Sequence, residues 1–326
     1  MQQNMNQQLA RIDYSISDYT KLYVRYNRQR ELQPFNFGLW WNSSDVPTPS
    51  RVIAPNASDS ISTNLTKVFN PTLTNELTFG YTFVDFPNQF EDPTKISRKG
   101  IAYAHPGLFK SGLDQLPSFT DWGSGIAEII LPGGFDPTLF ATKHLVSFGD
   151  NVTKVRGTHT LKAGFFYEHV INKQPNSGFS NGVLIPASWG SLTTGNNYAD
   201  LLLGHLAEYD EQTKNLINDE AYNITEGFLQ DSWKVKPNFT LELGLRLSYI
   251  GPWYGRNGAA AAIFDRSRYS NNPADLTKYT GVVDNTIDSS VPPSGTDRPG
   301  VTLGPRVGLA YSAFKNTVFR GGYGIF

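Results

Sequence analysis

Apolar and polar side chains alternate along much of this chain, most clearly over residues 238–250. The apolar positions there are Phe239, Leu241, Leu243, Leu245, Leu247 and Tyr249, and the positions between them are Thr240, Glu242, Gly244, Arg246 and Ser248. Successive side chains of a β-strand point to opposite faces. This period of two therefore predicts a strand with one apolar face and one polar face.

About a dozen segments share this pattern, which predicts an all-β, antiparallel fold. Two of them, near 178–187 and 205–216, alternate more weakly than the rest. The others lie at about 11–14, 20–28, 60–69, 73–84, 143–155, 158–171, 220–235, 238–250, 301–313 and 317–326.

The connections between these segments alternate in length. "SISD", "NPT", "RGT", "KPN" and "FKN" are short, whereas the stretches at about 30–59, 86–142 and 251–300 are long and rich in Pro, Gly and Asn. Outer-membrane β-barrels have short turns on the periplasmic side and long loops outside. We expect all short turns at one end of the sheet, with the longer link at 196–204 forming a short helical turn at that same end.

Two architectures fit the alternation. In a soluble sandwich the apolar faces of two sheets pack about 10 Å apart, whereas in a membrane barrel they face lipid. The barrel predicts that Leu243, Leu245, Phe79 and Tyr81 point outward. The sandwich predicts that they lie inside a two-layer core.

Composition narrows the function classes. The net charge is −1, which gives no support to a nucleic-acid partner. The chain has no cysteine, which excludes disulfides and Cys-ligated metals. No apolar run approaches the roughly 18 residues of a membrane helix, and the first 15 residues contain no signal-peptide core.

Candidate chemistry is sparse. The five histidines form no close metal-binding pair, and no nucleophile or phosphate-binding motif is present. The sequence therefore predicts no enzyme, no cofactor and no metal site. Acidic residues in the long loops could bind a cation or a ligand, but the simpler interpretation is that they are ordinary solvated charges. The histidines are His105, His144, His159, His169 and His205, and the acids are Asp114, Asp121, Glu128 and Asp136.

Two further sets of residues depend on the architecture. Trp233 and Trp253 lie near strand ends, where a barrel places its aromatic girdle. The charged residues of the polar faces would meet water in a sandwich, and a hydrated lumen or a plug domain in a wide barrel. They are Arg25, Glu76, Lys162, Glu168, Glu242 and Arg246.

Several stretches carry a more specific resemblance. They are "GFLQDSWKVKPNFTLELGLRLSY" (227–249), "RGTHTLKAGFFYE" (156–168), "NNYADLLLG" (196–204) and "GPRVGLAYSAF" followed by "TVFRGGYGIF" (304–326). Together they resemble the barrels of large TonB-dependent outer-membrane receptors, especially those with an N-terminal carboxypeptidase-regulatory-like domain. The match covers about 150–326 well, and "NPTLTNELTFGYTF" extends it toward the N-terminus.

The resemblance implies a barrel of about 22 strands with a plug folded inside, which imports a solute with energy from the TonB complex. We expect residues 1–326 to be part of such a barrel domain, with about 12 of its strands. The plug, the TonB box and the C-terminal barrel strands are absent from this stretch. The expected partners are outer-membrane lipid, the plug, the TonB complex and an unidentified solute.

The function expected from these features is solute uptake across a Gram-negative outer membrane. Two alternatives stay open. One is a passive, porin-like channel, and the other is a soluble, secreted carbohydrate-binding or adhesive β-protein. No ligand-binding residue can be assigned from the sequence.

Overall fold

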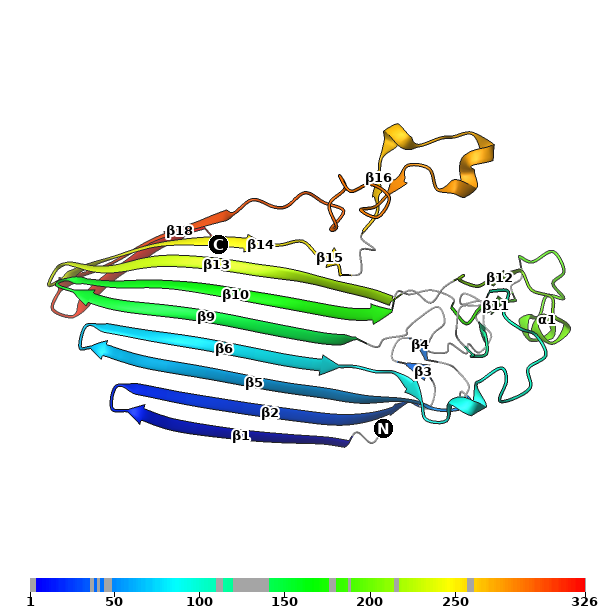
Figure 1. The fold of residues 1–326 in the computed structure, drawn as a ribbon, viewed down its shortest axis with the longest axis horizontal. Coiled ribbons are helices and arrows are strands. Elements are labelled where there is room, and N and C mark those ends of the chain that lie inside the picture. The colour runs from blue at the N-terminus through cyan, green and yellow to red at the C-terminus, as the bar shows by residue number, and fades with distance from the viewer. Residues whose placement is uncertain are drawn as a thin grey trace.

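The computed structural model describes residues 4–35, 38–39, 42–43, 49–109, 114–119, 141–175, 180–186, 189–213, 217–256 and 261–325. Ten long antiparallel strands form one sheet, in chain order (Figure 1). They are β1 (Asn4–Ser17), β2 (Thr20–Phe35), β5 (Val52–Asn70), β6 (Leu73–Asp85), β9 (Thr142–Arg156), β10 (His159–Pro175), β13 (Ile217–Lys236), β14 (Phe239–Ile250), β18 (Thr302–Phe314) and β19 (Thr317–Gly324).

Two short strands complete the sheet. β7 (Gln89–Phe90) pairs with β5, and β15 (Tyr254–Gly255) pairs with β13, which brings the sheet to 12 strands. The sheet is open, because β1 and β19 are each paired on one side only. The predicted all-β antiparallel fold is confirmed.

Five hairpins close at the same end of the sheet, the short-turn end (Figure 1, left). Each has a connection of two residues, at 18–19, 71–72, 157–158, 237–238 and 315–316. In the third of these, Gly157 has φ +59°, a left-handed conformation that glycine adopts without steric cost. The expectation that the short turns lie together is confirmed.

The opposite end, the loop end, holds smaller elements (Figure 1). β8 (Ser118–Phe119), β11 (Val183–Ile185) and β12 (Glu208–Asp210) form a three-stranded sheet beside α1 (Asn197–Leu203). The remaining elements are the pair β3 (Gly38–Leu39) and β4 (Asn42–Ser43), the pair β16 (Ile263–Phe264) and β17 (Val282–Val283), and 3₁₀ turns at Pro93–Lys95, Arg266–Arg268 and Pro273–Lys278.

Two expectations about this region are wrong. The described residues of the segments 178–187 and 205–216 are not strands of the main sheet, and the helix within 196–204 lies at the loop end rather than the short-turn end. The reason is that Val183 and Ile185 are fully buried, with Ala207 packed against them. Their alternation therefore reflects a small core within the loops and not a surface toward lipid.

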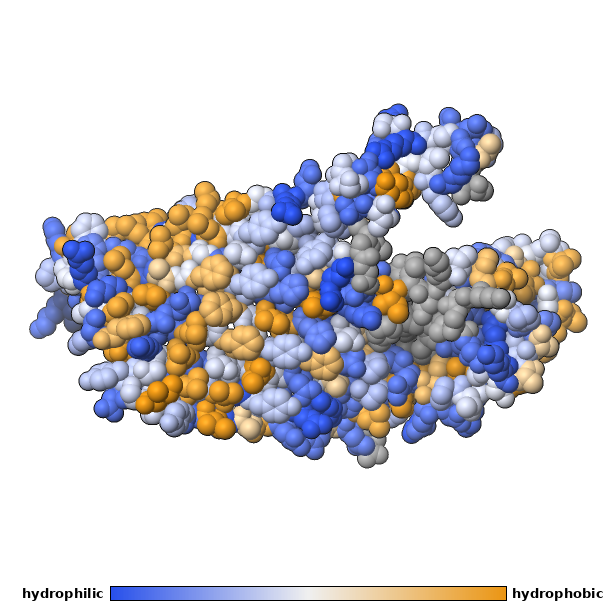
Figure 2. All heavy atoms as spheres, viewed as in Figure 1, coloured by the Kyte–Doolittle hydropathy of each residue, from blue (hydrophilic) through white to orange (hydrophobic). Residues whose placement is uncertain are grey.

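The main sheet is a single layer with two different faces. Residues paired across neighbouring strands share a face, and Phe79, Leu243 and Leu245 lie on what we call the outer face. These three side chains are 41–43% exposed, and Tyr81 beside them is half-buried. No described element covers them, so the sandwich hypothesis is wrong. Figure 2 shows apolar side chains over the long strands, most densely toward the short-turn end.

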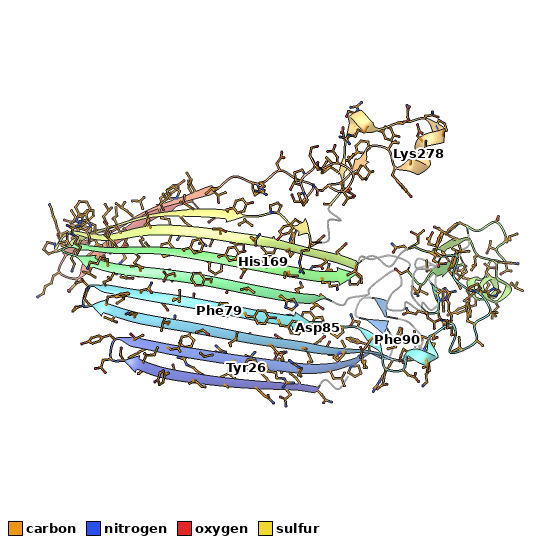
Figure 3. The ribbon with its side chains drawn as sticks, viewed as in Figure 1. Tyr26, Phe79, Asp85, Phe90, His169 and Lys278 are labelled. Atoms are coloured by element: carbon orange, nitrogen blue, oxygen red, sulfur yellow. The ribbon has the colours of Figure 1, made fainter. Side chains whose placement is uncertain are left out.

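Three tyrosines on the outer face orient their hydroxyl groups toward the loop end. Each hydroxyl bonds to a residue two cross-strand pairs nearer that end, as expected for rings that sit in the apolar layer with a polar tip in water. Figure 3 shows Tyr26 and Phe79 along the strands, with Asp85 nearer the loops. The bonds are Tyr26 to Asp59 (2.7 Å), Tyr81 to His144 Nδ1 (2.9 Å) and Tyr167 to Asn223 (2.9 Å).

The positions of these hydroxyls mark the edge of the apolar band that is nearer the loop end. From His159, beside a short turn, to Tyr167 the strand β10 extends for ~27 Å. A barrel strand tilts by about 40°, so this stretch covers about 21 Å along the membrane normal, most of the ~25 Å height of an outer-membrane apolar band. In the described part of the chain, no helix is long and apolar enough to span a membrane.

The connection between β6 and β9 folds back over the other face, the inner face. Phe35 and Val52 are a cross-strand pair on that face, and they are buried together with Ala54. Phe90 and Ile96 from the connection complete this cluster. The largest buried hydrophobic cluster among the described residues thus anchors a loop to the inner face.

Candidate functional site: the inner face and the loop cap

The inner face carries the charged residues that the alternation predicted. The strand register places all six on the same face, opposite the exposed leucines and phenylalanines. This part of the prediction is confirmed. The residues are Arg25, Glu76, Lys162, Glu168, Glu242 and Arg246.

Hydrogen bonds across the strands fix several of these groups. Glu226 accepts a bond from Arg246, with which it forms an ion pair, and another from Ser248 Oγ at 3.0 Å. Glu242 accepts from Ser232 Oγ at 2.6 Å. These cross-strand contacts order charges of both signs along β13 and β14.

A hollow of about 520 Å³ opens beside this charged cluster, over the strands from β6 to β18. Phe166, Phe228, Glu226, Arg246 and Arg306 contribute side chains to its wall. Its lining combines two aromatic rings with ions of both signs. Such a surface can hold an aromatic or charged solute, or a protein loop.

Glycine makes room for one of those rings. Gly164 pairs with Phe228 on one side and with Asn151 on the other. A Cβ atom at Gly164 would collide with the Phe228 ring and with the Asn151 side-chain oxygen. Gly164 therefore allows the ring to lie flat across β10.

A second hollow of about 560 Å³ adjoins the first and shares Gln230, Gly244 and Arg306 with it. Its floor is glycine-rich on β18 and β19, with Gly308 and Gly322 paired across these strands. The inner face there consists largely of bare backbone around Arg306. Together the two hollows form a continuous polar track that extends from β6 to β19.

At the loop end, the described residues within 86–119 and 180–213 form what we call the loop cap. Arg98 joins the two segments, because its guanidinium donates to the carbonyl oxygens of Gln115 (2.8 Å), His105 (2.8 Å) and Asn181 (2.7 Å). The Asn181 amide group then donates to the Leu116 carbonyl at 2.7 Å. The cap is thus cross-linked through side-chain-to-backbone bonds.

Glu211 makes the complementary set of bonds. Its carboxylate accepts from the backbone amides of Leu108 (2.7 Å) and Phe109 (3.1 Å) and from the Tyr209 hydroxyl (2.7 Å). Burial opposes ionisation of Glu211, but these three donors outweigh it and lower its pKa. Burial, and then the bond to Glu211, raise the pKa of Tyr209 to about 12.

The other candidate residues have structural partners or lie outside the described residues. Asp114 accepts from Ser97 Oγ at 2.5 Å and from the Lys99 amide at 3.2 Å, so it orders a turn. Asp121, Glu128 and Asp136 lie outside the described residues. The described residues contain no cluster of three or more potential metal ligands, the five histidines included.

The two tryptophans of the expected girdle have different surroundings. Trp233 lies on the outer face near a short turn, stacked on His159 with ring centroids 5.2 Å apart. Trp253 packs edge-on against Tyr222 at 4.4 Å, and Tyr222 belongs to the inner-face positions of β13. Only Trp233 therefore has the placement of a girdle residue.

Comparison with known proteins agrees with this geometry. The chain resembles the ferric-catecholate import receptor Fiu from E. coli K12 in its open form (11% identity, TM-score 0.51, 99% of this chain and 46% of Fiu) and its closed form (11%, 0.50, 99% and 43%). It also resembles the siderophore receptor PiuA from Acinetobacter baumannii (12%, 0.45, 99% and 42%).

This chain thus spans less than half the length of these solved structures. No curated protein matches it. The sequence model described as outer membrane beta barrel domain matches residues 1–326, which is the whole chain. The protein therefore belongs to the outer membrane beta-barrel domain family and is a protein of the Gram-negative outer membrane.

Proposed function

We propose that this chain forms part of the wall of an outer-membrane receptor that binds a solute outside the cell and takes it up through the barrel. The observation that carries the proposal is the polar track on the inner face. Phe166, Phe228, Arg246 and Arg306 line this track, and in our proposal they face a solute or an internal plug domain. The role is binding and passage, without catalysis.

The loop cap supports the same proposal from the outside. Arg98 and Glu211 make it an ordered surface rather than a set of free loops, and ordered loops on a rigid scaffold commonly carry recognition. The energy source is inferred from the sequence resemblance to TonB-dependent receptors. We therefore assign coupling to a TonB complex through a plug, with the solute left open as a siderophore, a glycan fragment or a peptide.

Uptake in cells that carry the complete gene tests this function. Cells with the gene, without it and with it restored are given labelled ferric siderophores, oligosaccharides and peptides, with and without a protonophore. A receptor predicts that one solute class accumulates only with the gene, and that the protonophore abolishes the accumulation. Accumulation that persists in the protonophore would establish a passive channel instead.

A further inference from the structure

A groove runs along the outer face over β10 and β13. Two adjoining hollows of about 390 and 550 Å³ share Val152, Ala163, Leu229 and Leu245. The floor is low because Ala163 and Gly227 have little or no side chain, and the walls are aliphatic and aromatic. Phe165 and Leu247 lie at its upper part, and Leu161, Leu243, Lys154 and Asp231 line its lower part.

Cations gather at the short-turn end of this groove. Lys154 and Arg156 are two residues apart on β9 and so point to the same face, ~7 Å apart along the strand. Lys154 donates to Thr72 Oγ1 at 2.8 Å. The Arg156 guanidinium is exposed and has no hydrogen bond or ion pair within the described residues. Both cations would lie at the periplasmic edge of the apolar band.

The nearby acid already has a hydrogen-bond partner in the protein. Asp231 faces this end of the groove, and its Oδ2 lies 2.7 Å from His159 Nδ1. Its Oδ1 is covered and has no hydrogen-bond partner among the described residues. Asp150, the other acid lining the groove, lies at the far end, four residues or ~13 Å along the strand from Lys154. The short-turn end is therefore net positive.

We propose that this groove binds one anionic phospholipid of the periplasmic leaflet. Its phosphodiester lies against Lys154 and Arg156, and one acyl chain runs up the groove over Ala163 and Gly227. Trp233, stacked on His159, borders the headgroup where interfacial tryptophans sit. The orientation is that of a periplasmic-leaflet lipid, with the phosphate at the short turns and the chain toward the membrane centre.

Native mass spectrometry of the full chain in detergent tests the site, with dioleoylphosphatidylglycerol as the probe. We expect one retained lipid, and a loss of affinity of about tenfold or more in the double variant Lys154→Ala/Arg156→Ala. The charge-conserving pair Lys154→Arg/Arg156→Lys should retain the lipid. Gly227→Leu should also weaken retention, because a Cβ there meets only the Gly164 carbonyl oxygen, at 3.7 Å, and the added side chain fills the groove.

Lys67→Ala is the matched control. Lys67 is another outer-face cation near a short turn, with its ammonium 4.8 Å from the centre of the Phe69 ring, but it does not line the groove. An equal loss of affinity in Lys67→Ala would show that lipid retention depends on surface charge in general, and the proposed site would be wrong. Equal retention of dioleoylphosphatidylcholine, or displacement of the lipid by inorganic phosphate at the same concentration, would overturn it as well.

Discussion

Two residues with opposite hydrogen-bonding capacity organise the loop cap. Arg98 has only donors, and three of its N–H groups donate to backbone carbonyl groups. Glu211 has only acceptors, and two backbone amides and a phenol satisfy those. Loop backbone that is buried must find such partners, because an unpaired buried group costs about 1–3 kcal/mol. These two side chains therefore allow long connections to fold without regular structure.

Tyr209 gives this network a measurable signature in alkali. Its pKa is raised to about 12 by burial and by Glu211, from an ordinary value of about 10. Because the folded value is the higher one, the stability that Tyr209 contributes is complete below pH ~10 and is lost as the pH rises toward about 12. We expect the phenolate absorbance of the intact protein minus that of Tyr209→Phe to show one group titrating near pH 12.

The variant Glu211→Gln tests whether Glu211 contributes to the raised pKa of Tyr209. It removes the carboxylate and leaves the burial, so the difference titration should move to lower pH. An unchanged midpoint in Glu211→Gln would show that the bond between Tyr209 and Glu211 does not contribute to the shift.

Strands differ in how well their sequence predicts whether they belong to the main sheet. β14 was predicted from alternation alone, because its apolar face meets lipid and its other face is polar along its whole length. β11 alternates too, but its buried residues pack within the loops, and three residues of alternation do not distinguish these surroundings. The partners of Arg98 and Glu211 are mainly backbone groups, which leave no side-chain pattern in a sequence.

Gly164 illustrates a packing constraint within one element. Gly164→Leu would place its side chain against the Phe228 ring and Asn151, and overpacking of this kind costs about 1–3 kcal/mol. We expect the free energy of unfolding in detergent, measured by urea titration of tryptophan fluorescence, to fall by that amount. Gly227→Leu, on the neighbouring strand and the opposite face, should leave it unchanged or raise it. A similar fall in both variants would indicate a general loss of strand glycine instead.

At the scale of the whole molecule, segregation of the two faces explains both what was predicted and what was not. Outer-face positions were identified from alternation because lipid favours apolar side chains at most alternate positions of the strand segments that cross the membrane. The polar track was not predicted, since it arises from rings and glycines that meet only when β10, β13, β14 and β18 lie side by side. The closing strands, the plug and the solute stay predictions.

Leu229 and Gln230 test the assignment of the faces directly. They are adjacent on β13 and both exposed, but Leu229 pairs with Ala163 and Leu245 on the outer face, whereas Gln230 pairs with Lys162 and Gly244 on the inner face. If the outer face meets hydrocarbon, Leu229→Arg should reduce the free energy of folding into phospholipid vesicles by about 2–4 kcal/mol. Gln230→Arg should cost much less, because it adds a cation to a hydrated face. Equal costs for the two variants would mean that the two faces meet the same solvent, and the assignment of a lipid-facing wall would fail.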